Sequence, residues 1–267
     1  MSHKLHNYLG ATGRFHEFKL HMKSRWKSFL ENIYKCSSKE LNTKIAENIN
    51  PHKRMREPED YTHVFRYLVR LGEFDFNTDF DSAEDVAIAK AVAHEQYNRR
   101  TRVADIAIIY LQEDAPYSYA IYPVCLPFPE DVANKNFTTT IYQEYPYGAG
   151  WGATQYQGAT SPTLQEVRLP VVTTEMCQNA YAGFPNQIID ERVICAGYKQ
   201  GGIDACSGDS GGPLFWPKVI FGNFGQRTIY YLIGVVSYGY RCAEPGFPGV
   251  YTRVSAYLPW ITEKLKQ

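Results

Sequence analysis

The sequence has no apolar run of about 18 residues, the length that predicts a membrane-spanning helix. It also has no excess of either charge, since 28 Lys and Arg residues balance 28 Asp and Glu residues. A nucleic-acid-binding chain would be basic, so that class of partner is not expected. With 44% apolar and 21% charged residues over 267 positions, the composition excludes a wholly disordered chain and allows one or two domains.

Cysteine is scarce, and no Cys-x-x-Cys pair occurs, which disfavours a zinc ribbon or a thioredoxin-type redox site. Six cysteines are too few for a small disulfide scaffold, but five of them follow residue 124, in a segment rich in Gly, Tyr and Val. Structural disulfides are therefore expected. The first residues contain no apolar stretch of the secretory type, which conflicts with that expectation.

The balanced total charge hides an asymmetry between two parts of the chain. Residues 1–66 carry 13 basic and 7 acidic side chains and six of the seven histidines, whereas residues 67–267 carry 15 basic and 21 acidic side chains. Between Phe15 and Tyr34, apolar residues recur three or four apart, which predicts an amphipathic helix with a solvated basic face. We predict that 1–66 is a separate basic segment, partly helical or disordered, ending in a polar linker.

From Tyr67 onward, short apolar stretches separated by turn residues predict an all-β structure. The stretch 106–111 is apolar at nearly every position, so it is expected to be buried on both faces. A short helix is predicted over 175–181 and a C-terminal helix over 257–266. The expected strands are Leu68–Leu71, Ile106–Leu111, Val167–Val172, Ile229–Ser237 and Gly249–Val254.

A glycine-rich stretch around Ser210 carries the strongest chemical signal. It reads Gly-Asp-Ser-Gly-Gly-Pro over 208–213 and follows Asp-Ala-Cys-Ser over 204–207. Glycines beside a serine let its hydroxyl reach a substrate and let backbone N–H groups converge on an incoming carbonyl. Ser210 is thus a candidate nucleophile. The alternative is a glycine-rich turn without chemistry, but a chance match of six residues is rare.

This stretch resembles the nucleophile segment of the trypsin-like serine proteases of the chymotrypsin fold. Further phrases occur in the order of that family over about three quarters of the chain, and two of them are most similar to the arthropod proteases that carry a clip domain. The phrases are Val69-Arg70-Leu71-Gly72-Glu73, His94 to Tyr97, Ala104-Asp105-Ile106-Ala107, Tyr122 to Pro127, Gly150-Trp151-Gly152-Ala153-Thr154, Ile194-Cys195-Ala196-Gly197 and Pro248-Gly249-Val250-Tyr251.

The resemblance implies two six-stranded antiparallel Greek-key barrels and a short C-terminal helix. Residues 67–267 would form a partial protease domain, because 67–125 supply only the latter half of the first barrel. Ser210 would be the nucleophile, and the backbone N–H groups of Gly208 and Ser210 would form the oxyanion hole. Asp105 would orient the catalytic imidazole; the alternative for it is a turn residue at the start of a strand.

Asp204 resembles the residue at the base of the primary specificity pocket, where a carboxylate pairs with a substrate Arg or Lys. Ser237, Gly239 and Gly249 would form the pocket walls. Ala205 supplies no hydroxyl beside the carboxylate, which favours Arg over Lys.

The resemblance also implies two disulfides, Cys177–Cys195 and Cys206–Cys242. Cys125 would pair with Cys36 or remain a free thiol. Asn136-Phe137-Thr138 is a glycosylation sequon, which matters only in a secreted protein.

Calcium is the one cofactor considered, because relatives hold it in the loop that corresponds to 73–85 and clustered oxygen ligands suit it. A solvated acidic loop is the favoured alternative, and no other metal is expected. The acidic side chains of this stretch are Glu73, Asp75, Asp79, Asp81, Glu84 and Asp85.

Two features that the family mechanism requires are missing from their places. In the family, the catalytic histidine lies in a Thr-Ala-Ala-His-Cys sequence shortly before the Val-Arg-Leu-Gly-Glu strand. This chain has no such sequence. His52 and His63 precede Val69, but the alanines and the cysteine that flank the family's catalytic histidine are missing around them. His94 matches a non-catalytic position of the family. The activation sequence Ile-Val-Gly-Gly is also missing, so Asp209 would lack the α-ammonium that pairs with it in the family.

We therefore expect a trypsin-like serine endopeptidase that cleaves after Arg or Lys but is inactive as written, with its N-terminal protease segment absent or replaced. The alternative is a non-catalytic homologue that serves as a binding or accessory factor in an extracellular protease cascade. An unrelated β-sandwich receptor fragment would not produce so many ordered motifs. The resemblance implies a secreted protein, protein or peptide substrates and serpin-type inhibitors.

Overall fold

The structure, a computed structural model, describes residues 67–78, 83–222 and 225–266. The predictions for 1–66, including the helix between Phe15 and Tyr34, lie outside the described residues.

The first sheet contains three antiparallel strands, β1 (Leu68–Leu71), β2 (Glu84–Ala93) and β3 (Ala107–Leu111), in that order. β1 has its predicted bounds, and β3 begins one residue later than predicted. Ile109 packs in a buried cluster with residues of β1 and β2, whereas Ile108 packs in a second cluster beneath the C-terminal helix. The prediction that this strand is buried on both faces is confirmed.

The second sheet contains six antiparallel strands, which explains the strong β-signal in the C-terminal half. The all-β, antiparallel fold class is thus confirmed, and the described residues supply three strands of the first sheet. Within the described ranges, no ladder joins the outer strands β5 and β6, and a single bridge between Val171 and Ala196 links the segment after β5 to β6. The strand order is β5 (Gln165–Arg168), β4 (Tyr147–Gly150), β7 (Pro213–Gly222), β8 (Gly225–Tyr238), β9 (Gly249–Arg253) and β6 (Val193–Ala196).

The strand predicted over Val167–Val172 is displaced toward the N-terminus, since β5 ends at Arg168. Pro170 has no N–H to donate to a neighbouring strand, so the ladder cannot continue through it. Beyond the proline the chain changes partner, and the Val172 N–H donates to the Cys195 carbonyl at 2.9 Å.

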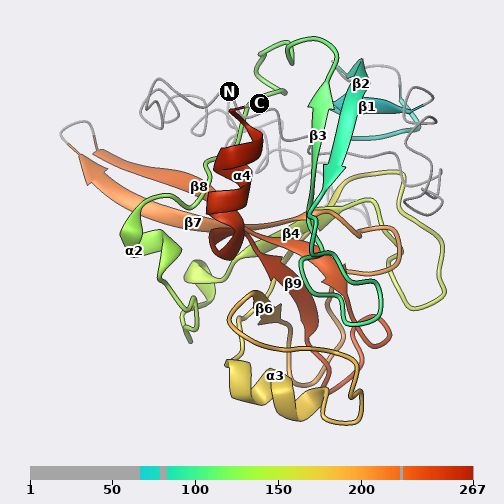
Figure 1. Cartoon of the computed structure of the whole chain (residues 1–267), viewed down its shortest axis with the longest axis vertical. Helices are drawn as coiled ribbons and strands as arrows, with labels where there is room; N and C mark the ends of the chain where they lie inside the picture. The colour runs from blue at the N-terminus through green and yellow to red at the C-terminus, as the bar shows by residue number, and fades with distance from the viewer. Residues whose placement is uncertain (1–66, 79–82, 223–224, 267) are drawn as a thin grey trace, which may run out of the picture.

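The helices are short and lie outside the sheets (Figure 1). The helix predicted over 175–181 is α3 (Thr174–Ala180), capped by the Thr173 hydroxyl, which accepts the Met176 N–H. The predicted C-terminal helix is α4 (Leu258–Lys264), preceded by the 3-10 turn η3 (Val254–Tyr257). Within the described ranges, no helix is long and apolar enough to cross a membrane. The other helical segments are α2 (Glu130–Ala133) and η2 (Tyr142–Glu144).

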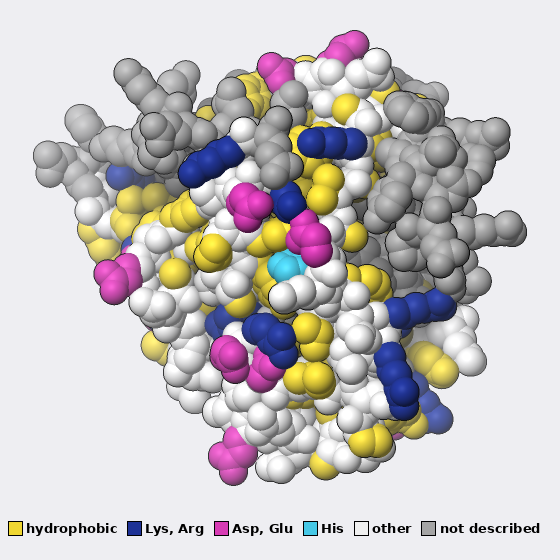
Figure 2. Space-filling view, in the orientation of Figure 1, with side chains coloured by type: hydrophobic (Ala, Val, Ile, Leu, Met, Phe, Trp, Pro, Cys, Tyr) yellow, Lys and Arg dark blue, Asp and Glu magenta, His cyan; other side chains and the backbone are white. Residues whose placement is uncertain are grey.

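Two features of the exterior are plain in the views. The β7–β8 hairpin extends away from the rest of the molecule (Figure 1). On the face that carries α4, acidic and basic side chains are interspersed rather than gathered by sign (Figure 2).

Candidate active site

Asp105 lies where the two sheets meet. It precedes β3 of the first sheet, and its Oδ2 accepts a 2.6 Å hydrogen bond from the hydroxyl of Ser237, near the end of β8. The buried Thr252 on β9 donates its hydroxyl to the Asp105 carbonyl at 2.7 Å, which fixes the backbone as well. Burial raises the pKa of Asp105, while the Ser237 hydrogen bond and the charge of Arg102 act in the opposite direction.

Between Gly208 and Gly211, N–H groups that donate to a backbone carbonyl alternate with N–H groups that do not. The Asp209 N–H donates to the Cys206 carbonyl and the Gly211 N–H to the Val236 carbonyl, both at 2.9 Å. In the part of the chain that the structure describes, the N–H groups of Gly208 and Ser210 donate to no backbone carbonyl. Gly208 has φ +103°, a conformation that favours glycine. Among residues 208–212, the two N–H groups predicted for an oxyanion hole are therefore the two not engaged by the backbone.

Hydrogen bonds between this loop and β8 bring Ser210 to the same end of the second sheet as Asp105. Gly211 donates to Val236, and the Val236 N–H returns a 2.9 Å hydrogen bond to the Gly212 carbonyl. The next residue after Val236 is Ser237, which binds the Asp105 carboxylate. The Ser210 side chain is exposed. Asp105 and Gly211, the residue after Ser210, thus bond to adjacent residues at the end of β8, Ser237 and Val236.

Asp204 lies beside two glycines that the resemblance places in the same pocket, Gly239 and Gly249. A Cβ added at Gly249 would lie 2.7 Å from Asp204 Oδ1, and one at Gly239 would lie 4.0 Å from Oδ2. The backbone N–H groups of Ala205 (2.8 Å) and Ala243 (3.4 Å) donate to the carboxylate. Burial raises the pKa of Asp204 to about 6; the two N–H donors oppose that shift and the charge of Asp209 adds to it. The structure therefore brings together Asp204, Gly239 and Gly249, whereas the Ser237 hydroxyl is directed to Asp105.

Sequence reasoning gave no role to Tyr251, which lies beside Gly249. Its side chain is fully buried, and a Cβ at Gly249 would lie 3.2 Å from its ring. Its hydroxyl has no hydrogen-bond partner among the described residues. Burial raises the pKa of Tyr251 well above its usual value, and the charges of Asp204 and Asp209 add to the shift. Tyr251 stands in the phrase Pro248 to Tyr251, but that phrase does not show that its hydroxyl would be buried without a partner.

Asp209 points away from solvent, toward β4 and the turn that follows it. Its Oδ1 accepts the Gly152 N–H at 2.7 Å and its Oδ2 accepts the Cys206 N–H at 2.9 Å. Burial raises the pKa of Asp209, and these two N–H donors oppose the shift. Within the described ranges, no basic side chain forms an ion pair with it. A Cβ at Gly150 would lie only 2.0 Å from Oδ1, so the glycine is needed for this packing.

The structure contains both disulfides that the resemblance implies. Cys177–Cys195 ties α3 to β6, and Cys206–Cys242 joins the Ser210 loop to the segment beside Asp204, with a Cα–Cα distance of 5.0 Å. Each constrains the unfolded chain by about 2–4 kcal/mol. Cys125 is disulfide-bonded rather than a free thiol. The predicted partner, Cys36, lies outside the described residues.

His94 is the one histidine in the described ranges, and its ring packs on two aromatic side chains. The ring centroid lies 4.9 Å from that of Trp260 and 5.2 Å from that of Tyr257, and Nδ1 accepts the Gln96 N–H. Burial lowers the pKa of His94. This agrees with the structural role predicted for it. His52 and His63 lie outside the described residues.

The acidic stretch 73–85 is partly a strand, which corrects the expectation of a continuous loop. Glu84 and Asp85 begin β2, and Arg70, opposite Asp85 on β1, donates Nη2 to its Oδ2 at 2.7 Å. This ion pair lowers the pKa of Asp85. The buried Glu73 accepts the N–H groups of Phe74 and Asp75. No group of three metal-ligating side chains occurs among the described residues. Calcium binding stays a prediction, because Asp79 and Asp81 lie outside them.

Comparison with known proteins places this arrangement in a family. The profile of the family described as Trypsin matches residues 62–261. The chain is 43% identical to venom serine protease Bi-VSP of Bombus ignitus over 72% of its own length, but it covers 51% of that relative. It is 42% identical to the venom protease of Bombus pensylvanicus, covering 73% of this chain and 74% of the relative. It is 41% identical to the proclotting enzyme of Tachypleus tridentatus, covering 74% of this chain and 50% of the relative. The chain thus belongs to the trypsin family of serine proteases.

Proposed function

We propose that this chain is a serine endopeptidase that binds an Arg or Lys side chain at Asp204 and attacks the following carbonyl with Ser210. The observation that carries the proposal is the Asp204 carboxylate beside Gly239 and Gly249, on a segment that the Cys206–Cys242 disulfide joins to the Ser210 loop. A substrate guanidinium offers paired donors to a carboxylate, and the two glycines leave room for a long side chain. Ala205 gives the pocket no hydroxyl at that position, which favours Arg over Lys.

The reaction would be acyl transfer. The Ser210 oxygen would bond to the carbonyl carbon while a general base removes the hydroxyl proton. The N–H groups of Gly208 and Ser210 would donate to the developing oxyanion, and collapse of the intermediate would expel the protonated amine. Asp105, held by Ser237, would fix the tautomer of the imidazole that serves as the base.

The imidazole is the part that the described residues do not supply, since the ring of His94 packs on Trp260 and Tyr257. We infer that the chain as written turns over slowly. Loss of the base from a serine protease triad lowers turnover by about 10⁴ to 10⁶. The same observation favours the second candidate function, a non-catalytic binding or accessory factor in an extracellular protease cascade. Protein substrates and serpin-type inhibitors would be the partners of a secreted enzyme.

Reaction with a fluorophosphonate, followed by intact mass, tests the catalytic part of this proposal. We expect Ser210 to be labelled at a rate about 10³-fold or more below that of trypsin, because no base activates the hydroxyl. Ser210→Ala is the control for site-specific labelling. Labelling as fast as that of trypsin would overturn the inferred inactivity. If that rate fell in His52→Ala or His63→Ala but not in His94→Ala, the identity of the base would follow.

A further inference from the structure

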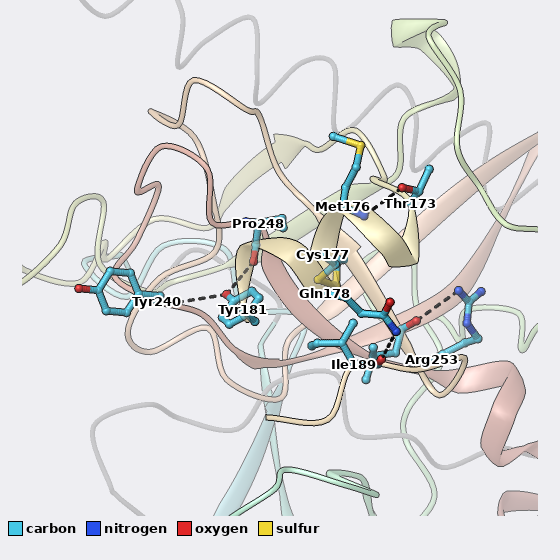
Figure 3. Close-up of a disulfide and its surroundings, with 11 residues drawn as sticks. Thr173, Met176, Cys177, Gln178, Tyr181, Ile189, Tyr240, Pro248 and Arg253 are labelled. Carbon is cyan, nitrogen blue, oxygen red and sulfur yellow. Dashed lines mark hydrogen bonds between the residues drawn. A yellow bond between two sulfur atoms is a disulfide. The ribbon is translucent and has the colours of Figure 1, made fainter. Parts of the chain in front are cut away.

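A cavity of about 200 Å³ lies between α3 and the ends of β6 and β9. Its lining contains neither Asp204 nor any residue of the Ser210 loop, so it is separate from the candidate active site. Its wall combines one guanidinium, that of Arg253, with threonine hydroxyls and aliphatic side chains. Figure 3 shows Arg253 beside Ile189, with Thr173 at the start of α3, near the Cys177–Cys195 disulfide.

Arg253 has no acidic partner in the part of the chain that the structure describes. Its two terminal nitrogens donate only to backbone carbonyls, Nη1 to Lys135 at 3.4 Å and Nη2 to Val193 at 3.2 Å. Burial lowers its pKa, and no neighbouring carboxylate opposes that shift. A guanidinium has five N–H donors, so these two hydrogen bonds leave several of them unused. A half-buried cation without a counter-ion is costly, which favours the binding of an anion.

The neighbouring arginine shows what a paired guanidinium looks like in the same region. Arg192, whose carbonyl accepts the Arg253 N–H, binds the Asp190 carboxylate through both Nε and Nη2. This pairing raises the pKa of Arg192 and lowers that of Asp190. Because Asp190 is already engaged, it does not neutralise Arg253.

We propose that this cavity binds a carboxylate carried on a short aliphatic stem, with Arg253 as its counter-ion. The planar guanidinium matches a carboxylate in two parallel hydrogen bonds. Thr173 uses its oxygen to accept the Met176 N–H, so its hydroxyl proton remains available as a further donor. Ile189, Val193 and Ile194 line the cavity with apolar surface that suits a hydrocarbon stem. A bare inorganic anion would leave that surface without contacts.

Titration of the full chain with butyrate and with butyramide tests the proposal, since the two have the same shape and differ in charge. We expect saturable millimolar binding of butyrate, with shifts of the backbone amide signals of Thr174, Val193 and Ile194, and at least about 10-fold weaker binding of butyramide. Arg253→Gln should abolish the preference for butyrate, Arg253→Lys should keep part of it, and Arg168→Gln is the matched surface control.

A second titration distinguishes a protein side chain from a free acid as the ligand. The methylamide of N-acetylglutamate carries the same group on a peptide; tighter binding than butyrate would support the site and identify a protein side chain as the ligand. Tighter binding of butyrate would support the site for a free acid. If Arg253 variants do not fold, a second variant is available. Thr174→Val removes a threonine hydroxyl from the cavity wall and should still weaken butyrate binding. The proposal is overturned if butyrate and butyramide shift the same signals equally, or if the butyrate response maps elsewhere.

Discussion

Asp204→Asn is expected to weaken the binding of benzamidine by about 100-fold or more near pH 8, as measured by calorimetry. Benzamidine presents the same paired N–H donors as an arginine side chain, and the Asp204 carboxylate lies beside Gly239 and Gly249, which have no side chains to block it. Removing one partner of a desolvated, hydrogen-bonded charge pair costs about 2–5 kcal/mol, and each 1.4 kcal/mol is about tenfold in affinity. Asp131→Asn, at an exposed carboxylate bound to Lys218, is the matched control.

The pH dependence of that binding follows from the same carboxyl. Burial raises the pKa of Asp204 to about 6, and benzamidine requires the ionised form. The affinity should therefore fall about tenfold per pH unit below pH 6 and become independent of pH well above it. Because the folded-state pKa is raised, the contribution of this carboxyl to stability is lost as the pH rises from about 4 to about 6. Asp204→Asn should then melt higher than the wild type near pH 8, which distinguishes lost binding from unfolding. Unchanged affinity of Asp204→Asn for benzamidine would contradict the proposal that Asp204 binds basic side chains.

Gly150→Ala is expected to destabilise the folded chain by about 3–5 kcal/mol, as measured by urea unfolding, because overpacking and broken buried hydrogen bonds combine. The new Cβ would lie 2.0 Å from Asp209 Oδ1, so the carboxylate would have to move. That movement would break its hydrogen bonds to the N–H groups of Gly152 and Cys206, and Cys206 leads directly into the Ser210 loop. Benzamidine binding should weaken as well, since Asp204 lies two residues before Cys206.

Gly148→Ala on the same strand supplies the control. A Cβ at Gly148 would lie 3.5 Å from the nearest atom, Cγ2 of Val167, which is ordinary van der Waals contact. This variant should change the stability by less than about 1 kcal/mol. Equal destabilisation by the two substitutions would mean that loss of glycine in β4, rather than displacement of Asp209, determines the effect.

The sequence predicted several of the strands that are rich in apolar residues, although it missed β6, and it gave no sign of β4 or β7. β3 and β9 were predicted because their side chains are buried regardless of strand pairing. β4 contains two glycines in four residues, and β7 contains Pro213 and Pro217, so local preference argues against both strands. β7 forms because it pairs along its length with β8 in a hairpin, and β4 forms because it pairs with β5 and with β7, which is distant in sequence. The pattern within each strand does not contain these pairings.

The candidate site shows the same division. Ser210 and Asp204 stand in one continuous motif, so the printed sequence is enough to single them out. The Ser237–Asp105 hydrogen bond joins residues 132 positions apart, and the hydroxyl of Thr252 reaches the Asp105 carbonyl over 147 positions. These contacts depend on how the two sheets meet. Ser237 was accordingly predicted as a pocket wall, whereas the structure directs its hydroxyl to Asp105.

The central claim is that Ser210 and Asp204 act in the same substrate-binding site. Its most direct test is a single-turnover acylation by 4-nitrophenyl 4-guanidinobenzoate, followed by intact mass and peptide mapping. The guanidinium should bind Asp204 and present the ester to Ser210, so one acyl group per chain should accumulate slowly at Ser210. Asp204→Asn should slow this acylation to the rate seen with the uncharged 4-nitrophenyl benzoate, and Ser210→Ala should abolish it. Acylation at other residues, or at Ser210 with a rate unaffected by Asp204→Asn, would contradict the account.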